Sequence, residues 1–270
     1  MSIKLIAVDM DGTFLSDAKT YNRERFLGQY QRMKEQGIRF AVASGNQYYQ
    51  LISFFPEIVD EIAFVAENGG WVVDAGEDIF NSSIPRDHFQ KVVRFLQTRS
   101  ELEIIACGKQ SAYTLKSYSD AFKEIAVRYY HRLEEIDSFD NIEDTLLKFG
   151  LNVPDTLVPQ MQKLIHDRVG DMLTAVTTGH GSIDLIVPGV HKAHGLRLLQ
   201  ARWGIEDSEV LAFGDSGNDI EMLRQSGYGF AMENASDVVK SVANYRAPGN
   251  NDEGVLQIIE KALNGEAPFA

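Results

Sequence analysis

The feature that most constrains this chain is an apolar run near its start, Leu5 to Val8. Two carboxylates, Asp9 and Asp11, come directly after it. A run that is apolar at every position is typical of a strand in the middle of a parallel sheet, covered on both faces. Open α/β sheets keep their chemistry at the carboxyl ends of such strands. The run therefore predicts an α/β fold with both carboxylates at the functional edge, because residues two apart along a strand face the same side.

Residues 9 to 13, Asp-Met-Asp-Gly-Thr, also allow two simpler explanations. Asp-rich segments with Gly are common surface turns, but such turns rarely follow a strand that is apolar on both faces. A calcium loop of the EF-hand type needs Gly at its sixth position and Glu at its twelfth. This chain has Phe14 and Thr20 there, so the calcium loop is excluded and a plain turn stays open as the alternative.

Composition limits the possible partners. The chain has 270 residues, 44% hydrophobic and 24% charged, which is enough for one large or two modest domains. Its formal net charge of −13 disfavours a nucleic-acid partner, since such binding needs clustered Lys and Arg. No apolar stretch approaches the roughly 20 residues of a membrane span. The single cysteine, Cys107, and a start without a signal-peptide pattern lead us to expect a cytoplasmic protein without a membrane partner.

Strand and helix patterns alternate over the first 80 residues and return near the end of the chain. The expected strands there are 5–8, 39–43, 62–66, 210–213 and 228–231, and the expected helices are 22–36, 47–55, 192–203, 218–226 and one after 236. Between them, residues 85–97, 119–130 and 154–169 favour helices, and residues 102–107, 146–153, 172–176 and 182–187 favour strands. We predict a Rossmann-like parallel-sheet core, residues 1–82 and 187–270, interrupted by an inserted α/β domain, residues 83–186.

Three further segments occupy positions suited to chemistry. Residues 214 to 219, Gly-Asp-Ser-Gly-Asn-Asp, place another carboxylate after an apolar strand, although helix capping would explain one of these side chains. Ser44 and Gly45 follow the strand 39–43 and either bind an anion or cap a helix. Lys192 begins a helix, where the helix dipole repels a cation, so its ammonium either reaches an anion or is simply solvated.

Signatures of other enzyme classes are absent from the sequence. There is no Gly-x-x-x-x-Gly-Lys loop for nucleotide phosphates, and residues 179 to 184 lack the third glycine of a dinucleotide fingerprint. The six histidines form no convincing zinc set. A Gly-x-Ser-x-Gly nucleophile elbow is missing as well.

Taken in order, the four segments resemble the motifs of the haloacid dehalogenase superfamily of aspartate-nucleophile phosphatases. That family has Asp-x-Asp-Gly-Thr after its first strand, Ser or Thr after its second, Lys at a later helix start and Gly-Asp-x-x-Asn-Asp after a fourth strand. This chain has each of them. The insertion of about 100 residues resembles the α/β cap domain of the Cof-type branch. Residues 231–235 and 251–255 also resemble segments of that branch, and the likeness is strongest to bacterial sugar phosphatases.

The resemblance implies a role for each motif residue. Asp9 would be the nucleophile, and Asp11 the general acid and base. Mg²⁺ would bind the carboxylates of Asp9 and Asp215 and the backbone carbonyl of Asp11, since hard oxygen ligands suit that ion. Asp219 would orient Lys192 or a metal-bound water. The groups expected to hold the phosphoryl oxygens are Ser44, the backbone at Met10 and Gly45, Asn218 and Lys192.

The implied activity is Mg²⁺-dependent hydrolysis of small phosphate esters, with sugar phosphates as the expected substrates, through an aspartyl-phosphate. A phosphotransferase or mutase using the same intermediate is one alternative. A non-enzymatic phosphometabolite sensor is another, but it would be expected to have lost Asp9 or Asp11, and both are present.

Substrate preference is less well defined by the resemblance. Asn46 stands where many Cof-type members carry Arg, and Glu233 stands where the usual run has Gly. These departures leave the chemistry intact but weaken the transfer of a substrate preference from any relative. The candidates for sugar contacts are Glu67, Asn68, Asn46 and the loop 179–182, which contains His180.

Overall fold

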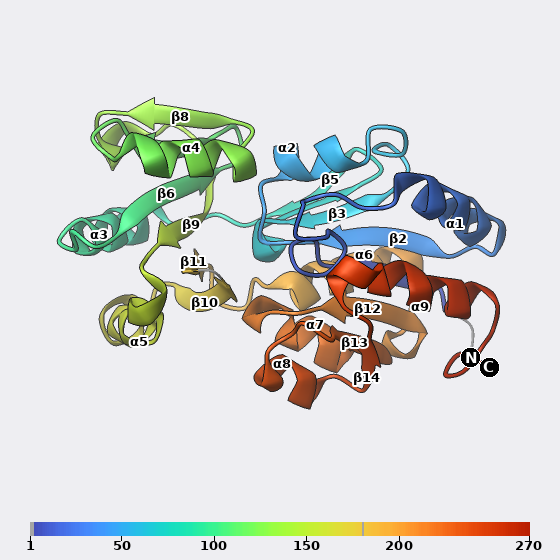
Figure 1. Cartoon of the computed structure of the whole chain (residues 1–270). Coiled ribbons are helices and arrows are strands. Elements are labelled where there is room, and N and C mark those ends of the chain that lie inside the picture. The colour runs from blue at the N-terminus through green and yellow to red at the C-terminus, as the bar shows by residue number, and fades with distance from the viewer. Residues whose placement is uncertain (1–2, 180) are drawn as a thin grey trace.

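The structure of the chain, a computed structural model, describes residues 3–179 and 181–270. Within these residues the strands form an eight-stranded sheet of order β14-β13-β12-β1-β2-β3-β4-β5 and a six-stranded sheet of order β10-β11-β9-β6-β7-β8. Figure 1 shows the smaller sheet, in green and yellow, beside the larger one. In the part of the chain that is described, no helix combines the length and the apolar character that a membrane span requires.

The larger sheet confirms the predicted parallel core. Its strands are β1 (Leu5–Val8), β2 (Arg39–Ala43), β3 (Ala63–Ala66), β4 (Trp71–Asp74), β5 (Glu77–Asn81), β12 (Val210–Gly214), β13 (Tyr228–Met232) and β14 (Tyr245–Ala247). Neighbouring strands from β14 to β3 pair in parallel, whereas β4 and β5 pair antiparallel. β1 lies between β12 and β2 and is buried at every residue, as its apolar run predicted.

Helices cover the core sheet. They are α1 (Arg23–Glu35), α2 (Tyr48–Leu51), α6 (Lys192–Trp203), α7 (Ile220–Gln225), α8 (Asp237–Val242) and α9 (Gly254–Leu263). The segment expected as one helix over 47–55 is instead α2 followed by a 3₁₀ turn, Ile52–Phe54. Consequently Ser44 and Gly45 do not directly precede a long helix, and the start of a long helix does not support the expected anion site.

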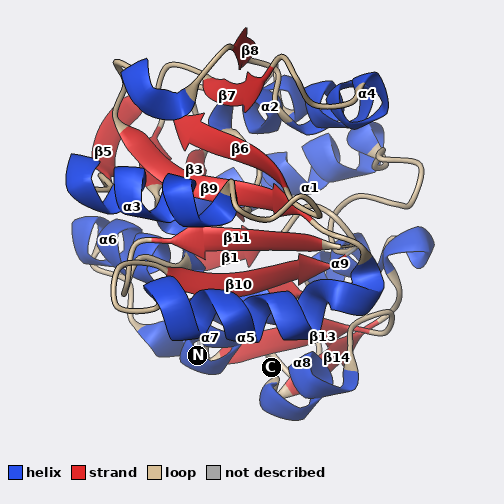
Figure 2. Cartoon of the chain, turned by 90° about the vertical axis from the view of Figure 1, so that its left-hand side faces the viewer, coloured by secondary structure: helices blue, strands red, loops and turns tan. Residues whose placement is uncertain are grey.

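The smaller sheet belongs to the inserted α/β cap domain. Its strands are β6 (Glu103–Gly108), β7 (Ala112–Leu115), β8 (Leu133–Ile136), β9 (Leu146–Asn152), β10 (Thr174–Gly179) and β11 (Ser182–Ile186), and its helices are α3 (Arg86–Leu96), α4 (Asp120–Tyr129) and α5 (Val158–Val169). Figure 2, which views this side of the molecule, shows α3 and α5 in front of the cap sheet.

Strand alternation divides the cap side chains between two faces. Ile104 and Ala106 pack with α3 and α5 in one apolar cluster. Ile105 and Cys107, the residues between them, pack with Phe122 of α4 in another. Because successive side chains of a strand point to opposite faces, α4 lies on the face of the cap sheet away from α3 and α5.

Several strands were not predicted from the sequence: β4, β5, β7, β8 and β14. The strand β8 has only exposed or half-buried residues and forms one edge of its sheet, as β5 and β14 do in the larger sheet. Edge strands bury less surface and so show a weak apolar pattern. The expected strand 172–176 begins two residues later, at Thr174, and extends to Gly179.

Candidate active site

Three motif segments meet at the carboxyl ends of adjacent core strands. Asp9 follows β1, Ser44 follows β2 and Asp215 follows β12. The backbone N–H of Asp9 donates to the carbonyl of Phe213, the last but one residue of β12, at 3.1 Å. Asp9 is 5% exposed and Ser44 is 2% exposed. The parallel order β12-β1-β2 therefore brings these residues together, as the sequence predicted.

Asp9 and Asp11 both line the same cavity, but not because a strand continues through them. β1 ends at Val8, and the chain turns at Met10, whose carbonyl accepts hydrogen bonds from the N–H groups of Thr13 and Leu15. The expectation that strand alternation places the two carboxylates on one side is wrong. The turn places them there, so the turn weighed as an alternative is part of the site.

Gly12 and Thr13 fix this turn against Asp215. Gly12 has φ +75°, a backbone conformation that favours glycine. A Cβ added there would lie 2.6 Å from Oδ2 of Asp215. Thr13 donates from its hydroxyl to Oδ1 of Asp215 at 2.9 Å. The motif thus holds the metal-ligand candidate Asp215 in place, a role for Thr13 that the sequence did not reveal.

Lys192 reaches the nucleophile candidate. It is the first residue of α6, and His191 caps the helix by accepting from the N–H of His194. Its ammonium donates to Oδ1 of Asp9 at 2.6 Å and to Oδ1 of Asp219 at 2.7 Å, with no exposed surface on the side chain. Burial lowers the pKa of Lys192, but Asp219 and Asp9 outweigh that effect and raise it above its ordinary value. The alternative of a solvated lysine is wrong.

Asp219 is positioned by the loop that contains it. Its Oδ2 accepts the backbone N–H groups of Asp215 and Ser216, each at 3.0 Å, and its Oδ1 accepts from Lys192. Both oxygens are therefore used within the protein. These are the contacts of a residue that orients Lys192 and the Asp215 loop, in agreement with the role that the resemblance implied.

Three carboxylates gather at this point, from Asp9, Asp215 and Asp219, and each offers an oxygen within 4.8 Å of the others. Burial and the charge of Asp219 raise the pKa of Asp9 well above its ordinary value, although Lys192 opposes them. The same two causes raise the pKa of Asp215 to about 6. One lysine does not balance three carboxylates of which two, Asp9 and Asp219, are buried, so a further cation is favoured here. Carboxylate oxygens suit a hard metal ion.

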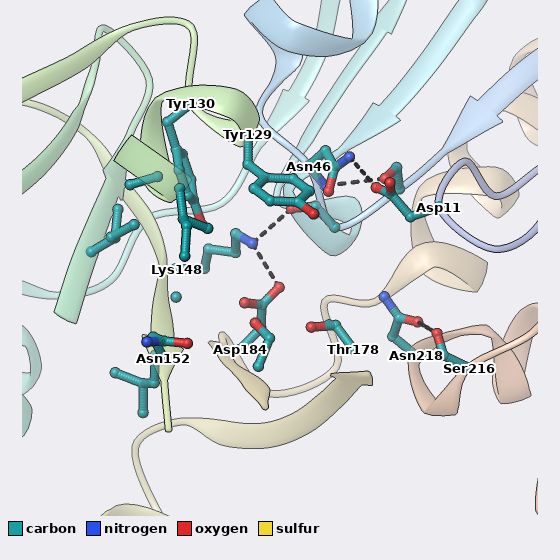
Figure 3. A pocket seen from close by; sticks show the side chains of 18 of the residues that line it. Asp11, Asn46, Tyr129, Tyr130, Lys148, Asn152, Thr178, Asp184, Ser216 and Asn218 are labelled. Carbon is teal, nitrogen blue, oxygen red and sulfur yellow. Dashed lines mark hydrogen bonds and ion pairs between the residues drawn. The ribbon is translucent and has the colours of Figure 1, made fainter. Parts of the chain in front are cut away.

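The cavity beside this cluster lies between core and cap and has a volume of about 340 Å³. Figure 3 shows Asp11, Asn46 and Asn218 on one side and Lys148, Asp184 and Asn152 on the other. Asp11 is held by Lys19 at 2.5 Å and by the amide of Asn46 at 2.6 Å. Its carboxylate thereby faces the space next to Asp9.

The expected phosphate-binding groups divide into two sets. Ser44, Gly45 and Asn218 line the cavity together with Asp9. The hydroxyl of Ser44 accepts the backbone N–H of Asn46 at 3.1 Å. Lys192 and Met10 are buried and do not belong to the described lining, and the ammonium of Lys192 meets that lining at Oδ1 of Asp9.

The candidates for sugar contacts are also separated by the structure. Asn46 and Ser182 line the cavity. Glu67 and Asn68 are each 1% exposed and lie beneath its described lining, facing Lys148 and Asp184. His180 lies outside the described residues.

Lys148 and Asp184 were missed in the sequence. In β9 the residues Lys148, Gly150 and Asn152 alternate with three apolar residues, 147, 149 and 151. This period of two is the signal that could have identified them, because it sends the polar set to the face opposite α3 and α5. Ser182 and Asp184 of β11 show the same alternation.

Comparison with known proteins supports the same chemistry. The family of haloacid dehalogenase-like hydrolases matches residues 6–259. The chain is 69% identical to 5-amino-6-(5-phospho-D-ribitylamino)uracil phosphatase YbjI of Escherichia coli, over 100% of this chain and 99% of that protein. It is 26% identical to the phosphatase of the same description, YitU, of Bacillus subtilis, over 95% of this chain and 96% of that protein.

Among solved structures, SMU.1108c from Streptococcus mutans superposes with a TM-score of 0.94 at 34% identity, over 97% of this chain and 100% of that one. These matches extend over both sheets of the fold described above. The resemblance drawn from the four motifs is confirmed. The chain belongs to the haloacid dehalogenase-like hydrolases and is a phosphoric monoester hydrolase.

Proposed function

We propose that the chain is a Mg²⁺-dependent phosphatase that uses Asp9 as its nucleophile. The observation that carries this proposal is the meeting of Asp9, Asp215 and Asp219 around a single buried lysine. Asp9 and Asp215 would hold Mg²⁺ by their carboxylates, with the backbone carbonyl of Asp11 as a third protein ligand. The bound ion would neutralise charge on the phosphoryl oxygens and on the nucleophile.

In the first step a carboxylate oxygen of Asp9 forms a bond to phosphorus while the bond from phosphorus to the ester oxygen breaks. Asp11 gives its proton to the leaving alkoxide, and an aspartyl-phosphate results. In the second step Asp11 takes a proton from water, and the water oxygen attacks phosphorus. The bond from Asp9 to phosphorus then breaks and inorganic phosphate is released. Lys19 and Asn46 keep Asp11 oriented for both transfers.

The phosphoryl oxygens would be held by Ser44, by the backbone N–H groups at Met10 and Gly45, and by Asn218. Lys192 would stabilise the charge that Asp9 carries and loses during transfer. Donors fixed in advance around the transferred group are the main source of catalysis in phosphoryl transfer.

The cap, proposed to comprise residues 83–186, would select the leaving group. One wall of the cavity is apolar and consists of side chains of α4 and the residue after it: Phe122, Ile125, Ala126, Tyr129 and Tyr130. Ile125 is 52% exposed. The facing wall is polar and includes Asn152, Thr178 and Asp184. Such a cavity suits a leaving group with hydroxyl groups and a planar ring whose face packs on the apolar wall.

We therefore propose a phosphate ester of a polyol or sugar chain that carries a planar ring. The two named relatives, described as 5-amino-6-(5-phospho-D-ribitylamino)uracil phosphatases, make that ester the first compound to test. Plain sugar phosphates, expected from the sequence, lack a group for the apolar wall and form the comparison set.

The test is a panel of phosphate esters with purified protein and Mg²⁺, scored by free phosphate release and kcat/KM. The ring-bearing ester is expected to exceed plain sugar phosphates by at least about tenfold. Equal or lower values for that ester would refute the substrate proposal. Formation of a new phosphosugar when an acceptor alcohol is added would instead favour the phosphotransferase.

A further inference from the structure

Lys148 is a buried cation that the proposed phosphatase chemistry does not use. It lies on cap strand β9 and is 2% exposed. Its ammonium donates to Oδ2 of Asp184 at 2.6 Å and lies 3.4 Å from Oε2 of Glu67. A buried lysine is strongly unfavourable unless carboxylates compensate it. Its two acidic partners come from both domains, Asp184 from the cap and Glu67 from the core.

The same ammonium contacts the loop expected to bind phosphate. It donates to the carbonyl of Gly45 at 2.7 Å. That carbonyl belongs to the peptide whose N–H, on Asn46, donates to the hydroxyl of Ser44. A lysine of the cap thus fixes the orientation of a peptide within the loop after β2.

Asp184 connects the cap to the second expected phosphate-binding loop, which carries Asn218. Its Oδ2 accepts from the amide of Asn68 at 2.5 Å, and Oδ1 of Asn68 accepts from the amide of Asn218 at 2.8 Å. Figure 3 shows Asp184 between Lys148 and the side of the cavity that carries Asn218. The cap therefore reaches both expected phosphate-binding loops, one through Lys148 and one through Asp184 and Asn68.

The segment that receives these contacts has an unusual backbone. Glu67 and Asn68 have φ of +51° and +56°, and Gly69 follows with +90°. Non-glycine residues in this region are strained, and such strain persists where the surroundings hold it, often at functional sites. Here Glu67 forms an ion pair with Lys148, and the side chain of Asn68 forms hydrogen bonds with both Asp184 and Asn218.

We infer that Lys148 and Asp184 are positioning residues that complete the phosphate-binding loops when the cap sits on the core. This inference rests on the proposed function, because it assigns phosphate binding to Gly45 and Asn218. Without Lys148 the carbonyl of Gly45 loses its donor, and without Asp184 the amide of Asn68, which holds the Asn218 amide, loses its acceptor. Small misplacements of such donors reduce catalysis strongly.

The experiment measures the binding of inorganic phosphate in the presence of Mg²⁺ by titration calorimetry, since phosphate has no leaving group for the cap to hold. Asp184→Asn and the pair Lys148→Met/Glu67→Gln are compared with the wild-type protein. The titrations are made at pH 8, above the pKa of about 7 of Glu67, so that the pair removes one positive and one negative charge and leaves the net charge of the cluster unchanged. Circular dichroism confirms that each variant is folded.

For both variants we expect the Kd of phosphate to rise at least about tenfold and kcat to fall by a similar factor. Asn152→Ala is the matched control, because Asn152 lines the same cavity but its amide donates to the cap residue Glu103 at 2.8 Å. It is expected to change KM for an ester substrate while leaving the Kd of phosphate within about twofold.

Three outcomes overturn the inference in different ways. If the wild-type protein is active but both variants bind phosphate as it does, Lys148 and Asp184 do not position the loops and the proposed function stands. If only KM for the ester rises, the two residues contact the leaving group instead. If the wild-type protein neither hydrolyses esters nor binds phosphate, the proposed function fails and the inference with it.

Discussion

The ammonium of Lys192 lies 2.6 Å from a carboxylate oxygen of Asp9, although the two residues are 183 positions apart in the chain. Asp9 follows the central strand β1, and Lys192 begins α6 after the whole cap has been inserted. A buried ion pair of this kind contributes little net stability. Its value lies in placing a fixed positive charge beside the group proposed to attack phosphorus.

Asp9→Asn is expected to abolish turnover while the protein remains folded. The amide has nearly the same shape as the carboxylate but is a poor nucleophile, so kcat should fall by at least about a thousandfold. Phosphate release and a circular dichroism spectrum provide the measurement. Activity near that of the wild-type protein would exclude Asp9 as the nucleophile.

Removal of the metal is expected to stop the reaction, and Mg²⁺ is expected to restore it. An ion that binds only the folded protein should, at a concentration about 100 times its Kd, add roughly 2.7 kcal/mol to the free energy of unfolding. Thermal melts with and without Mg²⁺ measure this effect. Asp215→Asn is the control and should lose the stabilisation, whereas indifference of the wild-type protein to chelation would remove the metal assignment.

Glu67 is expected to make stability depend on pH. Burial raises the pKa of Glu67 to about 7, although Lys148 opposes this and Asp184 adds to it. The folded protein therefore holds a proton that the unfolded chain releases near pH 4.5. The free energy of unfolding should fall as pH rises from about 4.5 to 7, by an amount on the order of 3 kcal/mol.

Glu67→Gln removes this titration while keeping the size of the side chain. The free energy of unfolding of the variant minus that of the wild-type protein should be markedly larger at pH 8 than at pH 5. Urea unfolding of both proteins at each pH measures this difference. The exposed residue Glu101 provides a control, since Glu101→Gln should change stability equally at both values. A constant difference between Glu67→Gln and the wild-type protein would contradict the prediction.

Gly150→Ala is expected to destabilise the cap because the new methyl group would clash with the hydroxyl group of Tyr130. A Cβ at Gly150 would lie 2.6 Å from the hydroxyl oxygen of Tyr130, whereas the next atom of that ring is 3.8 Å away. Forcing the two apart should lower the free energy of unfolding by about 1 to 3 kcal/mol. Tyr130→Phe removes the obstacle, so the double variant should recover most of the loss. Failure of the double variant to recover would show that the glycine is needed for another reason.

Elements with strong local patterns were predicted at their correct bounds. β2, Arg39–Ala43, and α6, Lys192–Trp203, match the expected segments residue for residue. β8 was not predicted, because Glu134 and Glu135 are exposed on an edge strand and leave no apolar alternation. Helix α4 was predicted, but its apolar residue Ile125 faces the cavity instead of the protein interior.

The sequence by itself determined where the motif residues of the core stand. Asp9, Ser44, Asp215 and Lys192 each stand at a strand end or a helix start, and these positions follow from local periodicity. Only the tertiary structure decided how the cap meets them. The antiparallel register of β9 and β11 sets Asp184 opposite Gly150. Lys148 is two residues from Gly150 on the same strand, so Lys148 and Asp184 are neighbours on one face of the cap sheet. Register depends on pairing between distant segments, so the contacts of Lys148 and Asp184 with the core loops became visible only in the folded chain.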